Sequence, residues 1–183
     1  MKIICKKNQK GFSLIEMMVV VVILGLIVLG LVTFFTGGTK SWVAGQSQLK
    51  AQREARQAMD RMVREIREGK NVKIGSTSHL ILFVTPFDGS PDIQYHLNTG
   101  TGRLYRNTAN AVIDNILNLS FTYFDNNGNP ICDVDGVPID PLDIDSASIV
   151  SKVHIDLQVD VDKDSNPDIT LNTDVNLRNF GLQ

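Results

Sequence analysis

The feature that most constrains this chain is an apolar run of 24 residues from Phe12 to Phe35, interrupted only by Ser13, Glu16 and Thr33. As a helix it would be about 36 Å long, enough to cross a hydrocarbon core of roughly 30 Å. We therefore predict a transmembrane helix over residues 12–36. Glu16 needs an explanation, because a carboxylate deep in a bilayer costs of order 2.5–3.5 kcal/mol.

The charges before the run predict its direction. Four lysines lie within residues 1–11, and no acid accompanies them. Short basic flanks stay in the cytoplasm. The sequence therefore places its N-terminal end inside the cell and the residues after the helix outside the cytoplasm.

Two simpler interpretations of this end are a cleavable secretory signal and a plain signal anchor. The apolar core of a secretory signal is about 7–15 residues long and is followed promptly by a cleavage site with small residues. Here the run is longer, and "VAGQ" at 43–46 lies well past it. Neither interpretation explains Glu16.

The junction "KGFSLIE" accounts for the glutamate. This junction resembles the class III signal of type IV prepilins and pseudopilins. It has basic residues, then Gly11 and Phe12, and then Glu16 as the fifth residue after the glycine. The resemblance implies that a prepilin peptidase cuts between Gly11 and Phe12 and methylates the new amine of Phe12. Residues 1–11 would then be a leader peptide, and the protein would reside in the bacterial inner membrane and later in a filament.

The same resemblance implies a role for Glu16 in assembly with other pilin or pseudopilin subunits. After cleavage Phe12 carries an α-ammonium group, which methylation leaves charged. Glu16 would pair with the amine of a neighbouring subunit, so that the cost of burying the carboxylate is offset only when that subunit docks.

Residues 37–70 are expected to continue as an amphipathic stalk helix. Its apolar residues recur at helical spacings, at Leu49, Ala55, Met59, Met62, Val63 and Ile66. Gly37 and Gly38 predict a kink or frayed turn at its start, because each glycine costs about 1 kcal/mol of helix stability. Gly69 is a candidate C-terminal cap. A nucleic-acid-binding helix is the alternative, but acids interleave the arginines, and a solvated helix face explains that pattern better.

Residues 71–183 change to the two-residue period of β-strands. We predict strands at 79–84, 92–97, 103–107 and 118–124, with turns at 98–102 and 125–130. The clearest pair lies near the C-terminus, where apolar residues alternate at 153–161 and again at 169–177. Such alternation is typical of an antiparallel sheet with one buried face. The stretch 133–146 reads as an irregular insertion.

This β domain is acidic: residues 71–183 contain 15 aspartates, no glutamate and only six basic side chains. We therefore predict no nucleic-acid contact. The order of "ARQAMDRMVREIREG", "IQYHLNTGTGRLYRN", "ILNLSFTYFDNNG" and "LNTDVNLRN" is similar to that in PilW-like minor pilins and the J-type minor pseudopilin of type II secretion. The implied fold class is α+β: a long N-terminal helix packed on an antiparallel sheet.

The last hairpin turn is a candidate calcium site. Oxygen-bearing side chains occupy every second position at Asp160, Asp162, Asp164, Asn166 and Asp168. Calcium takes six to eight oxygen ligands, and D-x-D-x-D loops supply them in this way. The loop departs from the EF-hand pattern at Ser165, where glycine is usual, and at Leu171, where glutamate is usual. The alternative is a solvated turn, since Asp, Asn, Ser and Pro favour turns.

We predict no enzymatic activity and no other cofactor. His79, His96 and His154 are scattered along the sequence, and Cys132 is the one cysteine left after removal of the leader. The leading interpretation is a minor pilin or minor pseudopilin. The alternative is an adhesive or ligand-binding module displayed on a pilin anchor. Type IV pili, type II secretion and DNA uptake share this signal, so the signal does not distinguish among them.

Overall fold

The computed structural model describes residues 11–83, 92–107, 110–133 and 135–178. The chain divides into two units, residues 1–46 and residues 47–183. The predicted leader lies almost entirely outside the described residues, which begin at Gly11. Both units contain part of one long helix, and all the strands belong to the second unit.

Helix α1 runs from Leu14 to Glu68 without interruption, over 55 residues. The frayed turn expected at Gly37 and Gly38 is therefore wrong, because both residues are helical. Each glycine costs only about 1 kcal/mol, and helical turns on both sides already supply the nucleus that an isolated segment would lack.

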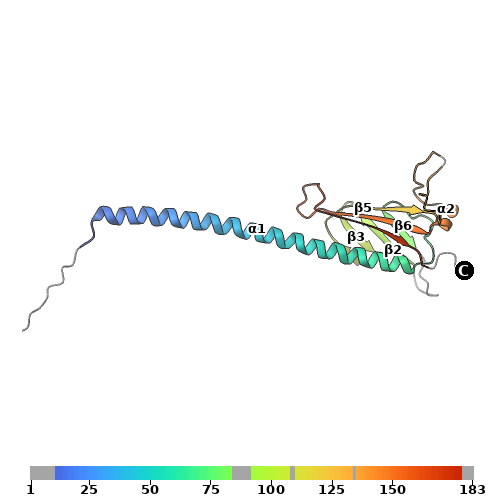
Figure 1. Cartoon of the computed structure of the whole chain (residues 1–183), viewed down its shortest axis with the longest axis horizontal. Helices are drawn as coiled ribbons and strands as arrows, with labels where there is room; N and C mark the ends of the chain where they lie inside the picture. Colours follow the sequence, from blue (N-terminus) through green and yellow to red (C-terminus); the bar gives the residue numbers. More distant parts are fainter. Residues whose placement is uncertain (1–10, 84–91, 108–109, 134, 179–183) are drawn as a thin grey trace, which may run out of the picture. The chain divides into compact units, whose positions relative to one another are not determined.

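In the described part of the chain, seven strands form two antiparallel sheets, and four of these strands are labelled in Figure 1. The first has the order β1–β2–β3–β4 and contains β1 (Leu80–Phe83), β2 (Ile93–Asn98), β3 (Arg103–Arg106) and β4 (Asn110–Ile113). The second has the order β5–β6–β7 and contains β5 (Ile116–Phe124), β6 (Lys152–Val159) and β7 (Ile169–Asn176). A short helix, α2 (Ile144–Ile149), precedes β6.

The predicted C-terminal hairpin is confirmed. β6 pairs with β7 over its whole length, from Lys152 opposite Asn176 to Val159 opposite Ile169. Every second residue of β6, beginning with Val153, is buried, and the residues between them are half-buried. This alternation turns one face of the sheet toward the core.

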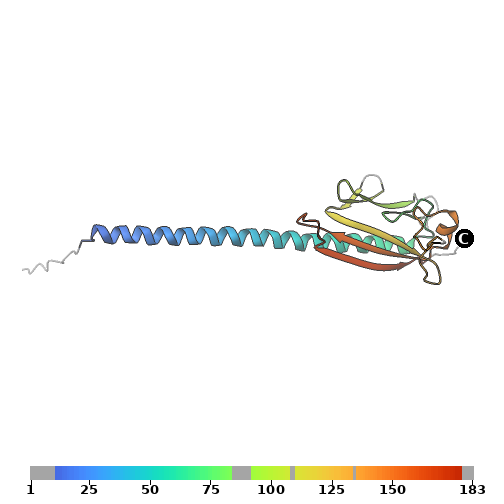
Figure 2. The ribbon, with the colours of Figure 1, turned by 90° about the horizontal axis from the view of Figure 1, so that it is seen from above.

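One hydrophobic core joins the C-terminal part of α1 to both sheets. Ala55, Met62 and Ile66 of α1 are fully buried and belong to a cluster that includes residues from all seven strands. Viewed from above, β5 to β7 (yellow to red) lie over this part of α1 (Figure 2). The predicted α+β fold, a long helix packed on antiparallel sheets, is confirmed.

Hydrogen bonds also tie the two sheets together where the chain enters β1. The backbone N–H of Phe121 in β5 donates to the carbonyl of Ser78 at 2.7 Å, and the hydroxyl of Tyr123 donates to the carbonyl of Thr77 at 2.9 Å. Nδ1 of His79 lies 2.6 Å from the carbonyl oxygen of Leu119. These contacts connect the segment just before β1, an edge strand of the first sheet, to β5, an edge strand of the second sheet.

Glu65 is the polar link between α1 and the first sheet. Its carboxylate accepts hydrogen bonds from the Arg106 guanidinium at 2.8 Å, the Tyr95 hydroxyl at 2.8 Å and the Arg61 guanidinium at 3.0 Å. Burial raises the pKa of Glu65, but these three donors outweigh it, so the net pKa is lowered. Burial and the neighbouring Glu65 carboxylate raise the pKa of Tyr95.

We expect Glu65→Gln to destabilise the second unit by about 1–3 kcal/mol at neutral pH, because it leaves charged and buried donors poorly paired. Because the pKa of Glu65 is lower in the folded state, its contribution to the free energy of unfolding is fully present above the unfolded-state pKa of about 4.3. This contribution is lost as the pH falls through the folded-state pKa. Denaturant unfolding of the detergent-solubilised full chain at pH 7 and pH 3 measures this.

The difference between wild type and Glu65→Gln should therefore shrink at pH 3. Exposed Arg64→Ala is the control, with an expected change within about 0.5 kcal/mol at either pH. A pH-independent difference for Glu65→Gln would contradict the electrostatic explanation and indicate altered packing.

Three local features differ from the sequence-based expectation. Strand β4 was not predicted, and α2 lies at the end of the stretch 133–146 that was expected to be irregular. Asp143 caps α2 by accepting a hydrogen bond from the N–H of Ser146 at 2.8 Å. Gly69 follows α1 but has no positive φ; it is needed for space, since a Cβ there would lie 3.0 Å from both the Ile66 carbonyl oxygen and the Phe83 ring.

Candidate functional site

The predicted processing site lies just before α1. Gly11, Phe12 and Ser13 are exposed and not helical, and the helix begins at Leu14. The carbonyl of Ser13 accepts hydrogen bonds from the N–H groups of Glu16 at 3.1 Å and Met17 at 3.3 Å, which starts the first turn. An exposed, non-helical peptide bond between Gly11 and Phe12 is open to a peptidase.

Glu16 occupies the first turn of α1 and is exposed. The N-terminal end of a helix favours a negative charge, because its unpaired N–H groups leave a partial positive charge there. Phe12, four residues earlier, has 78% of its surface exposed. Cleavage before Phe12 would therefore put an ammonium group and a carboxylate at the same end of one helix. The roles of Gly11, Phe12 and Glu16 in processing and assembly stay predictions.

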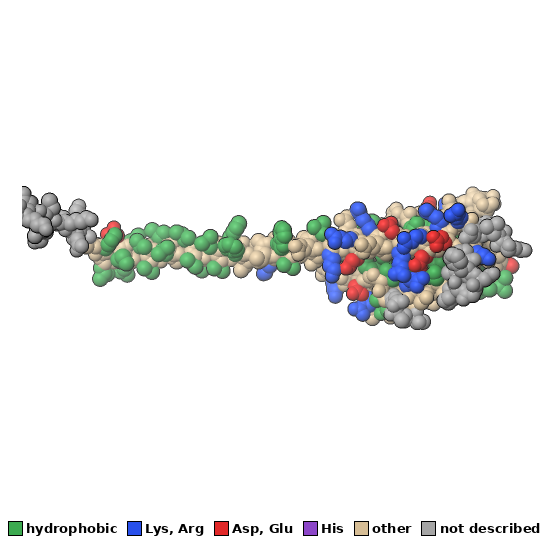
Figure 3. All heavy atoms as spheres, turned by 90° about the horizontal axis from the view of Figure 1, so that it is seen from below, with side chains coloured by type: hydrophobic (Ala, Val, Ile, Leu, Met, Phe, Trp, Pro, Cys, Tyr) green, Lys and Arg blue, Asp and Glu red, His purple; other side chains and the backbone are tan. Residues whose placement is uncertain are grey.

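The apolar part of α1 is exposed along its length. An 18-residue window of α1 reaches a mean hydropathy of 3.1 with none of its residues buried, and the helix is long enough to span a membrane. Hydrophobic side chains (green) line the N-terminal part of α1 in Figure 3. In water such a surface would be strongly unfavourable, so it requires lipid or other apolar helices around it.

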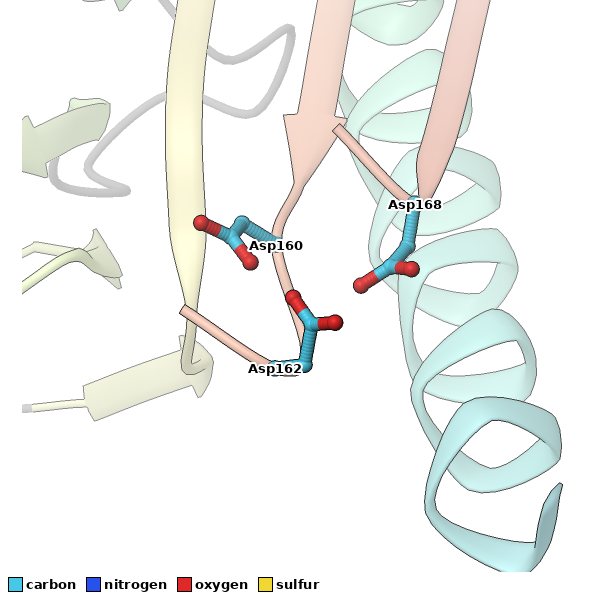
Figure 4. A group of neighbouring side chains, drawn as sticks. All are labelled: Asp160, Asp162 and Asp168. Carbon is cyan, nitrogen blue, oxygen red and sulfur yellow. The ribbon is translucent and has the colours of Figure 1, made fainter. Parts of the chain in front are cut away.

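The predicted calcium loop connects β6 to β7. Asp160, Asp162 and Asp168 gather between the ends of these strands (Figure 4), and one oxygen from each lies within 4.8 Å of the others. Two oxygens bound to one calcium ion are at most about 5 Å apart. Asp160 is buried, with 7% exposed, whereas the other two are exposed. The structure therefore brings together three of the four predicted aspartate ligands.

Backbone groups hold these carboxylates in place. Asp160 accepts from the N–H groups of Lys163 at 2.6 Å and Ser165 at 2.8 Å, and Asp168 accepts from the N–H of Val161 at 2.7 Å. Ser165 has a φ of 70°, which lies in the left-handed region that glycine adopts most easily. EF-hand loops usually have glycine at this position. A carboxylate has about four acceptor positions, so these bonds leave room for an ion.

The charges in the loop repel one another. The N–H of Asp164 lowers the pKa of Asp162, but lost hydration and the negative charges of Asp164 and Asp168 outweigh it, so the net pKa of Asp162 is raised. A bound cation would relieve this repulsion.

The other two predicted ligands bind each other instead. Asp164 accepts from the backbone N–H of Asn166 at 2.8 Å and from its side-chain amide at 3.2 Å. These hydrogen bonds lower the pKa of Asp164. The alternating sequence pattern could not distinguish these two residues from the three that meet, because the distinction depends on the backbone path of the turn.

The three histidines have separate partners in the described part of the chain. His79 contacts the Leu119 carbonyl, His96 stacks on Tyr105 at 5.3 Å between ring centroids, and Nδ1 of His154 lies 2.6 Å from Asp174. The hydrogen bond to His154 is the main cause that lowers the pKa of Asp174. Cys132 is half-buried and unpaired. The contacts of His79, His96 and His154 lie within and between the sheets.

Sequence reasoning missed a pocket of about 270 Å³ between the segment after α1 and helix α2. Val72, Ile74, Ile144 and Ala147 are among its lining residues. The pocket depends on α2, which the sequence did not predict, and only the turn that ends α1 brings residues 71–74 beside it.

Comparison with known proteins matches the N-terminal part of the chain to a family. The family described as "Prokaryotic N-terminal methylation motif" matches residues 6–32, which include Gly11, Phe12 and Glu16. No curated protein matches the chain. The motif supports a type IV pilin-like protein, in a class of structural subunits, and it implies processing by a prepilin peptidase and assembly with other pilin subunits.

Proposed function

We propose that this chain is a minor pilin or minor pseudopilin, a structural subunit of a type IV pilus or a type II secretion pseudopilus. A prepilin peptidase cuts after Gly11 and methylates Phe12, and the mature chain assembles through its hydrophobic N-terminal helix. The observation that carries this proposal is the methylation motif at residues 6–32, which coincides with an exposed peptide bond ahead of an exposed apolar helix.

The helix supports assembly for an energetic reason. Its apolar residues have two stable environments, lipid and the interior of a helical filament. The position of Glu16 in the first turn makes the second environment selective, because a neighbour's ammonium group must neutralise the carboxylate there. The membrane stores the subunit, and the ion pair sets its register against the next one.

The acidic β domain faces the space outside the cytoplasm. Its direction follows from the lysines before the helix, which remain on the cytoplasmic side of the inner membrane. Deletion of the gene separates the assembly role from a display role: loss of all filaments favours a subunit that primes assembly.

The direct test is the intact mass and N-terminal fragmentation of the protein extracted from its native membrane. A mature chain that begins with N-methylated Phe12 is the expected result. A chain that begins at Met1 in cells with an active prepilin peptidase would overturn the proposal and leave a signal-anchored β domain.

The second candidate function is a ligand-binding or adhesive module on the same anchor, with calcium at the 160–168 loop. The observation that favours it is the approach of Asp160, Asp162 and Asp168 within 4.8 Å together with the raised pKa of Asp162. Carboxylate oxygens are ligands that calcium prefers. These three aspartates would hold the ion, with Asp164 and Asn166 as further sequence-based candidates.

We expect calcium to raise the melting temperature of the full chain in detergent. An ion that binds only the folded state at 100 times its Kd adds about 2.7 kcal/mol of stability. Asp162→Asn should abolish the calcium effect but not lower stability in chelator, because it removes like-charge repulsion. Asp164→Asn is the matched control, since Asp164 pairs with Asn166, and it should keep most of the effect. An equal melting temperature with calcium and with chelator would exclude the site.

A further inference from the structure

The segment of α1 just beyond the apolar run, residues 36–42, contains two threonines, two glycines, a lysine and the only tryptophan of the chain. We propose that Lys40 and Trp42 lie at the membrane–water interface on the non-cytoplasmic side of the inner membrane. Helix α1 then stays in hydrocarbon as far as Thr39, and Glu16 lies at the cytoplasmic interface before assembly. This inference rests on the proposed membrane-stored subunit. The partner surface is the phospholipid headgroup layer.

The threonine hydroxyls allow the helix to stay in lipid past Phe35. Thr33 donates to the carbonyls of Gly30 at 2.9 Å and Leu29 at 3.1 Å. Thr36 and Thr39 repeat the pattern, each with acceptors three and four residues earlier at 3.0–3.1 Å. Each hydroxyl proton is thus satisfied within the helix, which removes most of the cost of burying it in an apolar medium. Glycine is also common in transmembrane helices.

The next two side chains suit a boundary. Lys40 is the first charged residue after Glu16, and its long stem can follow apolar surroundings while its ammonium group reaches the headgroups. Trp42 has 69% of its surface exposed. Tryptophan is enriched at membrane interfaces, because its ring is largely apolar while its indole N–H needs a polar partner. Anionic lipid phosphates complement Lys40.

This boundary fixes where Glu16 lies. A core of about 30 Å takes roughly 21 residues of a helix tilted by about 20°. Counted inward from Thr39, the core then ends near Val19, and Glu16 lies beyond it. The proposed membrane segment is therefore shifted toward the C-terminus relative to the span 12–36 predicted from the sequence. Even a tilt of about 40° extends the core only to roughly 26 residues, which ends near Leu14. Glu16 therefore stays within one helical turn of the cytoplasmic surface.

Two consequences follow for the proposed function. The bond between Gly11 and Phe12 lies in or beyond the cytoplasmic headgroup layer, where a peptidase acting from that side reaches it. The Glu16 carboxylate also stays hydrated in the stored subunit, and it becomes dehydrated only when the helix enters an assembly. The ion pair with a neighbouring amine is then needed at assembly and not for storage.

Fluorescence tests the boundary, because Trp42 is the only tryptophan. The purified full chain is placed in phosphatidylcholine–phosphatidylglycerol vesicles whose acyl chains carry bromine at shallow or deep positions. We expect shallow bromines to quench Trp42 several-fold more strongly than deep ones. Two single-tryptophan variants in a Trp42→Phe background calibrate depth: Phe35→Trp lies one heptad inward, and Leu49→Trp lies one heptad further along the chain.

The Phe35→Trp variant should be quenched best by deep bromines, and Leu49→Trp by aqueous iodide only. The inference is overturned if Trp42 behaves like Leu49→Trp, or if neither bromine nor iodide quenches it, as in a protein–protein contact. The intact mass of the same preparation shows independently whether the chain begins at Met1 or at Phe12. A processed chain with unquenched Trp42 would overturn the boundary alone. A chain that is unprocessed, although purified from cells with an active prepilin peptidase, and that shows the expected quenching would overturn the pilin proposal alone.

Discussion

Replacement of Gly11 by valine is expected to stop removal of residues 1–11, with a fall in the cleavage rate of order 100-fold or more. A peptidase pocket that accepts glycine excludes a branched side chain, and such steric discrimination reaches this size in enzymes. The substitution leaves the fold alone, because a Cβ at Gly11 would meet no atom within 4 Å and the residue precedes α1. Intact mass of the membrane-extracted protein gives the fraction processed.

Gly38→Ala is the matched control for this experiment. A Cβ at Gly38 also meets no atom within 4 Å, but the residue lies inside α1, where alanine is a better helix former by about 1 kcal/mol. Normal processing of Gly38→Ala beside an unprocessed Gly11→Val would locate the effect at the cleavage site. Efficient cleavage of Gly11→Val at the same bond would contradict the class III signal.

Replacement of Glu16 by glutamine is expected to leave processing intact and to remove the chain from the filament. In the assembled state the substitution leaves a neighbour's Phe12 ammonium group without a counter-charge. Loss of one partner of a buried ion pair costs about 3–5 kcal/mol, or roughly two to four orders of magnitude in affinity. Quantitative immunoblots of sheared filaments and of membranes from the same cells measure incorporation.

Thr33→Val serves as the control for Glu16→Gln. It also removes a polar group from α1, but that hydroxyl is bonded only within its own helix, so incorporation should stay near wild type. Both variants should be retained in the membrane fraction, since Glu16 is hydrated there if the proposed boundary holds. Wild-type incorporation of Glu16→Gln would show that the carboxylate has no part in docking.

Local patterns were sufficient for much of the fold. The two-residue alternation at 153–161 and 169–177 predicts the hairpin that the structure confirms as the antiparallel pair β6–β7. The helical spacing of Ala55, Met62 and Ile66 predicts most of the face of α1 that is buried. Leu49 was predicted on the same face but is 66% exposed. In each case one face of the element is buried, so apolar residues repeat with the period of the strand or the helix. That period in the sequence therefore indicates which residues lie on the buried face.

The division of the strands into two sheets, and the strand β4 and helix α2, could not be predicted in this way. Strand order depends on contacts between residues far apart in sequence, such as those from Ser78 and His79 to β5. The six-residue helix α2 is too short to be stable by itself, and Asp143 and its burial against the core maintain it.

The candidate sites divide along the same line. Residues 11–16 and the apolar run are recognised by their composition and spacing, because lipid and a peptidase act on a short contiguous segment. Only the tertiary structure shows that Asp160, Asp162 and Asp168 meet while the fourth aspartate of the loop does not. The contacts of Glu65 with Tyr95 and Arg106 also required it. Side chains meet there only after the turn and the sheet have folded, and no sequence period encodes that approach.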